Sequence, residues 1–173
     1  MISLSSCEGI QKIKTCLDRE CYFEARKELV DFSKNENVDN DSLFVFIECL
    51  KSPCFLLRYE ALFSLKLFAY KDFVRSAIIE RLNDESWLMR HEALKILRNY
   101  ISLDERIFPL FIESLKDESP VIIDELLIFL EPYINKDNKD IIIKNCLQNK
   151  YLFKRTIRIL SKYASINYFE VMN

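Results

Sequence analysis

Apolar side chains recur along this chain at a helical spacing and also at a longer period of 32 or 33 residues. The longer period is marked by a column of five leucines: Leu17, Leu50, Leu82, Leu115 and Leu147. Twelve residues after each of them stands a second aliphatic column: Leu29, Leu62, Leu94, Leu127 and Ile159. Two apolar columns that keep one spacing across five units are typical of a repeat array.

Each unit predicts a pair of helices. In the third unit, apolar residues at helical spacing predict a first helix over 73–82 and a second over 87–100. The polar turn between them, 83–86, supplies short side chains that suit a helix N-cap. The fourth unit repeats this scheme with a helix over 107–115 and a second one from Pro120, because proline suits the first position of a helix.

The polar stretches 34–40 and 135–140 fall at equivalent phases of the repeat, so we interpret them as loops between repeats. Glycine occurs once and proline four times, which argues against β-hairpins and phosphate-binding glycine loops. The sequence therefore predicts an all-α fold of about five helical hairpins in a single domain, 1–173.

Composition and net charge limit the classes of protein and the cellular locations that we expect for this chain. The formal net charge is -2 and half of the residues are hydrophobic, so we expect a soluble protein without a general attraction to nucleic acid or to an anionic membrane. The first residues do not resemble a signal peptide, and the longest apolar runs are too short to span a bilayer. We expect a cytoplasmic protein with reduced cysteines that is monomeric on its own.

The best-preserved units resemble a known family. Leu82-Asn83-Asp84, Met89-Arg90, Ala93 and Leu97 are similar to the HEAT repeat, in the short form found in bilin-lyase-like proteins. The second unit matches with Leu50, Leu57-Arg58, Ala61 and Leu65, whereas the fourth unit has Ile123 in place of the arginine and the first and fifth units depart further. The resemblance implies a right-handed α-solenoid, but it gives almost no information about function.

Candidate chemistry is sparse. His91 is the only histidine, and no P-loop, nucleophile elbow or HExxH motif is present, so we expect no catalytic residue. The pairs Cys16/Cys21 and Cys49/Cys54 share one spacing, but serine replaces cysteine at these phases in later units, which favours packing over metal binding. We therefore expect neither a metal nor a cofactor. The resemblance implies that Arg58, Arg90 and Arg155, with Asp84 and Asp117, form a structural ladder between repeats.

The second helices carry the stronger signal. Their side away from the core, which lines the concave surface in HEAT-like solenoids, gathers aromatic and charged residues of the kinds that dominate binding hot spots. The predicted partner-binding residues are Phe55, Tyr59, Phe63, Trp87, His91, Lys95, Arg98, Asp124 and Glu131. The alternative for Phe55 and Phe63 is lateral packing between second helices.

Three functions fit this surface. The first is a non-catalytic module that binds a protein partner on its concave face, and an immunity protein that occludes a toxin is one case of it. The second is nucleic-acid binding like that of HEAT-like alkylpurine-DNA glycosylases, with Trp87, Arg98 and Asp124 in the concave set; the negative charge and the lack of a basic stripe disfavour it. The third is a bilin-lyase-like subunit, suggested by the repeat subtype alone.

Overall fold

A computed structural model describes residues 4–34, 38–135 and 137–147 of the chain, and these residues form helices and turns without a β-strand. The all-α prediction is therefore confirmed for the described part of the chain. The chain divides into two compact units, Met1–Ile96 and Leu97–Asn173. The prediction of a single domain stays a prediction.

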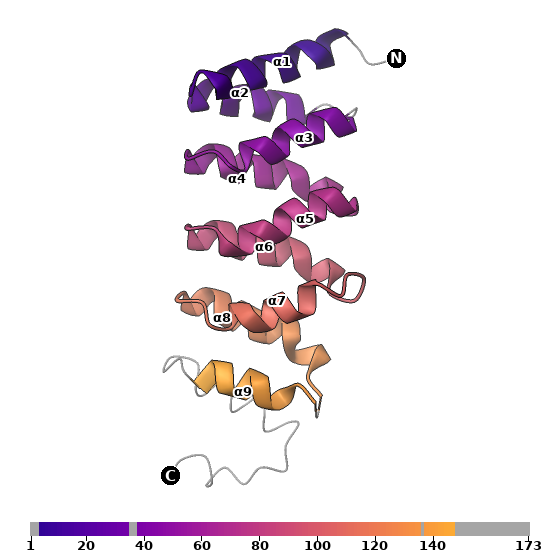
Figure 1. The fold of residues 1–173 in the computed structure, drawn as a ribbon, viewed down its shortest axis with the longest axis vertical. Helices are drawn as coiled ribbons and strands as arrows, with labels where there is room; N and C mark the ends of the chain where they lie inside the picture. The colour runs from indigo at the N-terminus through magenta and orange to yellow at the C-terminus, as the bar shows by residue number, and fades with distance from the viewer. Residues whose placement is uncertain (1–3, 35–37, 136, 148–173) are drawn as a thin grey trace. The chain divides into compact units, whose positions relative to one another are not determined.

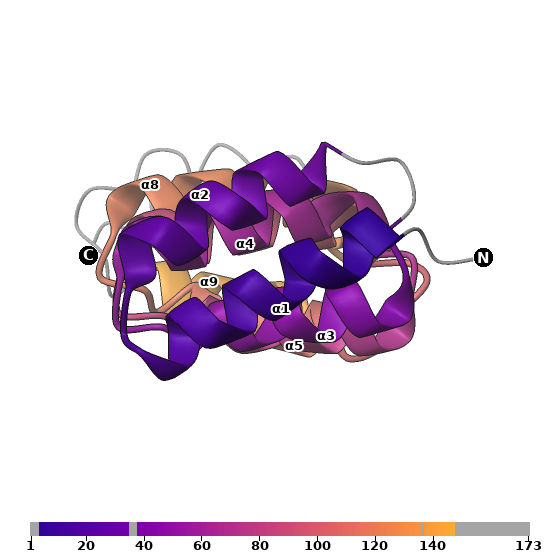
Figure 2. The ribbon, with the colours of Figure 1, turned by 90° about the horizontal axis from the view of Figure 1, so that it is seen from above.

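The first unit is built from two layers of helices. Its helices are α1 (Leu4–Asp18), α2 (Tyr22–Ser33), α3 (Asn40–Cys49), α4 (Phe55–Leu65), α5 (Asp72–Glu80) and nearly all of α6 (Trp87–Leu97). α1 packs against α2 and α3 packs against α4, while α1, α3 and α5 follow one another in one layer and α2 lies beside α4 in the other. Figure 1 shows these helices in chain order, and Figure 2 shows the two layers from above.

The buried stripes of these helices follow the apolar columns. In α4 the buried side chains include Leu57, Ala61 and Leu65, spaced by four residues, so that they lie on one side of the helix. The column leucines Leu50 and Leu62 are buried as well. Packing of one helix stripe against the next therefore supplies the core of this unit, as the periodicity predicted.

The second unit contains three described α-helices. They are α7 (Ile107–Ser114), α8 (Pro120–Leu130) and α9 (Lys139–Leu147), and two short 3₁₀ turns, η3 (Arg98–Tyr100) and η4 (Glu131–Tyr133), follow α6 and α8. α7 packs against both α8 and α9. Pro120 occupies the first turn of α8, where a missing N–H removes no helical hydrogen bond.

The predicted helix starts hold to within one residue, since α5 begins at Asp72 and not at 73, and the helix ends shift further. α6 begins at Trp87 as expected, but it ends at Leu97 and a 3₁₀ turn covers the remaining residues to Tyr100. Part of the polar stretch 135–140 is helical, because α9 already begins at Lys139. The second helix predicted for the fifth unit, with Arg155, lies outside the described residues. None of the described helices combines the length and apolarity that crossing a membrane requires.

Candidate protein-binding surface

The outward side of α4 presents an aromatic residue to solvent. Phe63 is 54% exposed, and the Nζ of Lys66 lies 3.5 Å from the centroid of its ring. Phe55 and Tyr59 are half-buried, with ring centroids 5.9 Å apart. Phe63 is therefore on the surface, and Phe55 is partly covered by its neighbours. The lysine gives the exposed ring of Phe63 a charged neighbour, so the surroundings of the ring are not purely apolar.

The outward side of α6, one sequence repeat after α4, also presents an aromatic residue to solvent. Trp87 is 48% exposed, and its ring centroid lies 6.3 Å from that of His91. His91 was expected to be a surface residue, but only 16% of its side chain is exposed. Further along α6, Lys95 donates to Glu92 at 3.0 Å, so its charge is held by an ion pair within the helix.

An ion pair joins this side of α4 to α2. The Nη2 and Nε of Arg26 both donate to Oε1 of Glu60, at 2.6 and 3.2 Å. Phe23 on α2 and Leu56 on α4 are exposed and lie 33 residues apart, at one phase of the repeat. These two residues were not among those predicted from the sequence, although their shared phase, one position after Tyr22 and Phe55, could have identified them.

We call the outward side chains of α2, α4 and α6 the second-helix surface: Phe23, Arg26, Leu56, Tyr59, Glu60, Phe63, Trp87, His91 and Lys95. These residues share a side because their helices are equivalent by repeat phase and the opposite stripe of each helix is buried. Of the other four predicted residues, Phe55 is half-buried beside Tyr59 on α4, and Arg98, Asp124 and Glu131 belong to the second unit. There Arg98 is exposed and its guanidinium carbon lies 4.9 Å from the ring centroid of Phe129, while Asp124 and Glu131 are half-buried.

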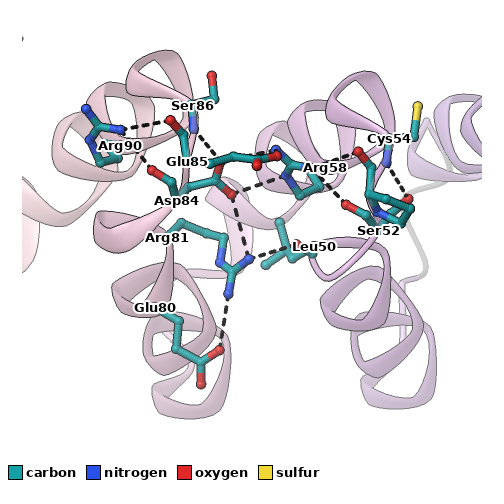
Figure 3. Close-up of polar contacts among 11 residues, drawn as sticks. Leu50, Ser52, Cys54, Arg58, Glu80, Arg81, Asp84, Glu85, Ser86 and Arg90 are labelled. Atoms are coloured by element: carbon teal, nitrogen blue, oxygen red, sulfur yellow. Dashed lines mark hydrogen bonds and ion pairs between the residues drawn. The ribbon is translucent and has the colours of Figure 1, made fainter.

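The arginines at the start of the second helices hold turns together. Figure 3 shows that Nη1 of Arg58 donates to the carbonyl oxygens of Ser52 and Pro53, at 2.9 and 3.1 Å. Nη1 of Arg90 contacts the equivalent carbonyls of Asp84 and Glu85 in the same way, at 2.9 and 3.1 Å. Each arginine therefore closes the turn that precedes its own helix.

Arg58 also reaches the turn of the following repeat. Its Nε lies 3.2 Å from Oδ2 of Asp84, and its Nη2 donates to Oε1 of Glu85 at 2.7 Å (Figure 3). From the other side, Nη1 of Arg81 lies 3.8 Å from Oδ2 of Asp84 and donates to the carbonyl of Leu50 at 2.8 Å. Arg58 and Asp84 thus form the rung that the resemblance implied, and their polar groups are used inside the protein instead of being offered to an anion.

Of the four cysteines in the two predicted pairs, Cys49 is buried, as packing expects, whereas Cys21 is exposed and Cys16 and Cys54 are half-buried. Cys49 ends α3 and is fully buried, and burial raises the pKa of its thiol to about 12. Cys21 and Cys54 are the N-cap residues of α2 and α4. Burial also raises the pKa of Cys16. Thiols with raised pKa values are poor nucleophiles and poor metal ligands at neutral pH.

The described residues contain no group of three or more histidine, cysteine or acidic side chains that could hold a metal ion. Comparison with known proteins gives no match, because no family model, no curated protein and no solved structure is significantly similar to this chain. The geometry of the second-helix surface is therefore the basis for inferring a function.

Proposed function

We propose that this chain is a HEAT-like α-solenoid that binds a protein partner on its second-helix surface and catalyses no reaction. The observation that carries the proposal is the exposure of Phe63 and Trp87 at one side of α4 and α6. Large aromatic side chains dominate protein-binding hot spots because they bury much area and lose few rotatable bonds on binding.

The charges around these rings support a protein partner. Lys66 lies over Phe63, Lys95 pairs with Glu92, and Arg26 pairs with Glu60, so cations and carboxylates alternate on the surface. Mixed charges of this kind orient a partner through complementary contacts. A nucleic acid would instead favour a continuous basic stripe, which the described residues of α2, α4 and α6 do not form.

The test removes the two exposed rings together. In the double variant Phe63→Ala with Trp87→Ala, we expect a partner captured from the native cell extract by the wild-type chain to be lost. Each ring contributes about 2 kcal/mol to binding if it is a hot spot. Captured proteins are identified by mass spectrometry, and binding of the purified partner is then measured by calorimetry. A toxin whose active site is occluded is one partner that this arrangement would suit.

A matched control removes exposed apolar side chains elsewhere. Tyr70 and Leu103 are both exposed and lie in turns, outside the second helices. The variant Tyr70→Ala with Leu103→Ala should capture the partner as well as the wild-type chain does. Undiminished capture by a folded Phe63→Ala, Trp87→Ala variant contradicts the assigned surface.

A further inference from the structure

An open cavity lies on the first-helix layer of the first unit. It is a groove of about 810 Å³ between α1 and α3, closed at one end by the turn that leads into α4. The groove lies within the size range of pockets that accept several side-chain-sized groups. Its lining combines the apolar side chains of Leu17, Phe44 and Val45 with five charged side chains.

An ordered aromatic ring stands in this groove. Phe44 is 53% exposed, and its ring stacks on that of Phe73 with centroids 4.9 Å apart and planes at 28°. Because the stacking already fixes the ring, little side-chain entropy is lost when a ligand covers it. The buried neighbour Val45 and the half-buried Leu17 add apolar surface beside the ring.

The charges of the groove are predominantly acidic. Asp18, Asp41 and Glu48 contribute three carboxylates, against two ammonium groups from Lys14 and Lys51. Glu48 is neutralised by Lys51, whose Nζ lies 2.8 Å from its Oε1. Asp18 and Asp41 have no ion pair among the described residues, which leaves two carboxylates against one lysine. The groove therefore attracts a positive group and repels a phosphate or an acidic peptide.

The chain itself repeatedly places cations over aromatic rings, at Lys66 over Phe63 and at Lys71 over Tyr70. Among the described residues, the ring of Phe44 has no cation above it, while Asp41 stands one helical turn before it on α3. An arginine side chain can stack on such a ring and pair with a neighbouring carboxylate at the same time.

We propose that the groove between α1 and α3 binds a segment of a partner protein that carries an arginine next to an apolar residue. The guanidinium group stacks on Phe44 and pairs with Asp41, and the apolar side chain covers Leu17 and Val45. This surface lies on the layer opposite the second-helix surface, so the two sites are independent and one can fail while the other holds.

The test uses the peptide acetyl-Ala-Leu-Arg-Leu-Ala-amide as its probe, together with two matched peptides in which citrulline or glutamate replaces the arginine. Each is titrated to about 10 mM into the ¹⁵N-labelled full chain, and backbone amide shifts are followed by NMR. We expect the arginine peptide to shift the amides of α1 and α3. The citrulline peptide, which keeps the shape and loses the charge, should bind about fivefold more weakly, and the glutamate peptide more weakly still.

Three variants test the contributions of the carboxylate and of the aromatic ring. Asp41→Asn keeps the size of an exposed side chain and should weaken the arginine peptide about fivefold, whereas Asp31→Asn, on the exposed surface of α2, should leave its affinity unchanged. Phe44→Ala should weaken it about tenfold, in line with the loss of a stacked cation. Equal binding of the glutamate peptide, shifts confined to other helices, no shift at all, or a groove occupied by a second copy of this chain would each overturn the proposal.

Discussion

Arg58 on α4 and Asp84 in the turn before α6, 26 residues apart, form a buried ion pair between two successive repeats. The guanidinium Nε lies 3.2 Å from Oδ2 of the carboxylate, and the two side chains are only 6% and 4% exposed. Asp84 also accepts a hydrogen bond from the N–H of Ser86 at 3.0 Å, which fixes the turn before α6. The carboxylate of Asp84 therefore binds a residue of the preceding repeat and also fixes the turn from which α6 begins.

Removal of this carboxylate should lower stability strongly. In Asp84→Ala, Arg58 keeps its carbonyl contacts and its exposed partner Glu85 but loses its buried counter-ion. We expect the free energy of unfolding to fall by about 3 kcal/mol, the lower end of the range for breaking a buried pair. Urea denaturation followed by circular dichroism measures it.

The control breaks an exposed pair. Lys34 and Asp31 are 3.1 Å apart with most of both side chains in solvent, so Asp31→Ala should change stability by less than about 1 kcal/mol. In the double variant Arg58→Met with Asp84→Ala, part of the lost stability should return, because the buried guanidinium of Arg58 is removed together with its counter-ion. Equal effects of Asp84→Ala and Asp31→Ala would contradict the ladder.

Substitution of Gly9, the single glycine of the chain, should also change the stability of the fold. A Cβ added at Gly9 in α1 would stand 2.9 Å from Cδ2 of Phe32, a ring that is buried and packs edge-on against Phe46. Alanine is favoured over glycine in a helix by about 1 kcal/mol, but overpacking costs about 1–3 kcal/mol. We therefore expect Gly9→Ala to lower the free energy of unfolding by about 1 kcal/mol, measured by urea denaturation.

A double-mutant cycle tests the cause. Phe32→Leu shortens the ring side chain, so Gly9→Ala should be less harmful in that background than in the wild-type chain. Gln11→Ala, at an exposed position of the same helix, serves as the propensity control and should be close to neutral. Stabilisation by Gly9→Ala in the wild-type chain would show that Phe32 does not limit the approach of α1 and α2.

The structural features that could be predicted from the sequence are those that recur with the period of the repeat. The column residues Leu50 and Leu62 are buried, and the family resemblance implied the structural ladder to which the Arg58–Asp84 pair belongs. Periodicity also separated the outward Trp87 from the buried Met89 on α6. These features repeat in several units, so each unit supports the interpretation of the others.

The groove of the first unit could not be predicted in this way. Phe44 lies in a continuous apolar run, Leu43 to Ile47, which has no polar position to mark the outward side of α3. The depth of His91 was also missed, because it depends on neighbouring side chains such as Trp87 and not on the helical phase alone. The exposure of such side chains depends on tertiary packing, which the local sequence pattern does not show.

The N-cap of α3 predicts an acid-dependent contribution. The carboxylate of Asp39 accepts hydrogen bonds from the N–H and the hydroxyl of Ser42, at 2.8 and 2.6 Å, and these bonds hold its pKa below the usual range. A carboxyl whose pKa is lower in the folded state stabilises the fold above its unfolded pKa, and this contribution is lost as the pH falls through the folded value.

Asp39→Ala should therefore cost about 1 kcal/mol at pH 7, the usual value of an N-cap. The difference between wild type and variant should shrink as the pH is lowered below about 4, the usual pKa of an aspartate, and urea denaturation at a series of pH values measures it. Asp41→Ala removes an exposed carboxylate from the same first turn and should have a smaller effect. A gap between wild type and Asp39→Ala that widens in acid has the wrong sign for this mechanism.

The cysteines should differ in reactivity. Cys21 is exposed, whereas Cys49 is fully buried with a thiol pKa of about 12, so almost none of the Cys49 thiol is ionised at pH 8. We expect iodoacetamide to label Cys21 quickly and Cys49 only through unfolding. Mass spectrometry of the digested protein resolves each site over time. In urea, Cys49 should become as reactive as Cys21, and equal labelling of the two in the native protein would contradict the burial of Cys49.

Trp87 offers a direct optical test of the second-helix surface, because it is the only tryptophan of the chain and its side chain is 48% exposed. Acrylamide should quench its fluorescence in the native protein, and the emission should lie to the red of that of a buried indole. Binding of a partner on α4 and α6 should shift the emission to the blue and protect it from acrylamide, since the ring leaves water. Binding in the groove between α1 and α3 should leave both signals unchanged, so one measurement distinguishes the two surfaces. Native emission that resists acrylamide before any partner is added would mean that Trp87 is already covered and cannot anchor one.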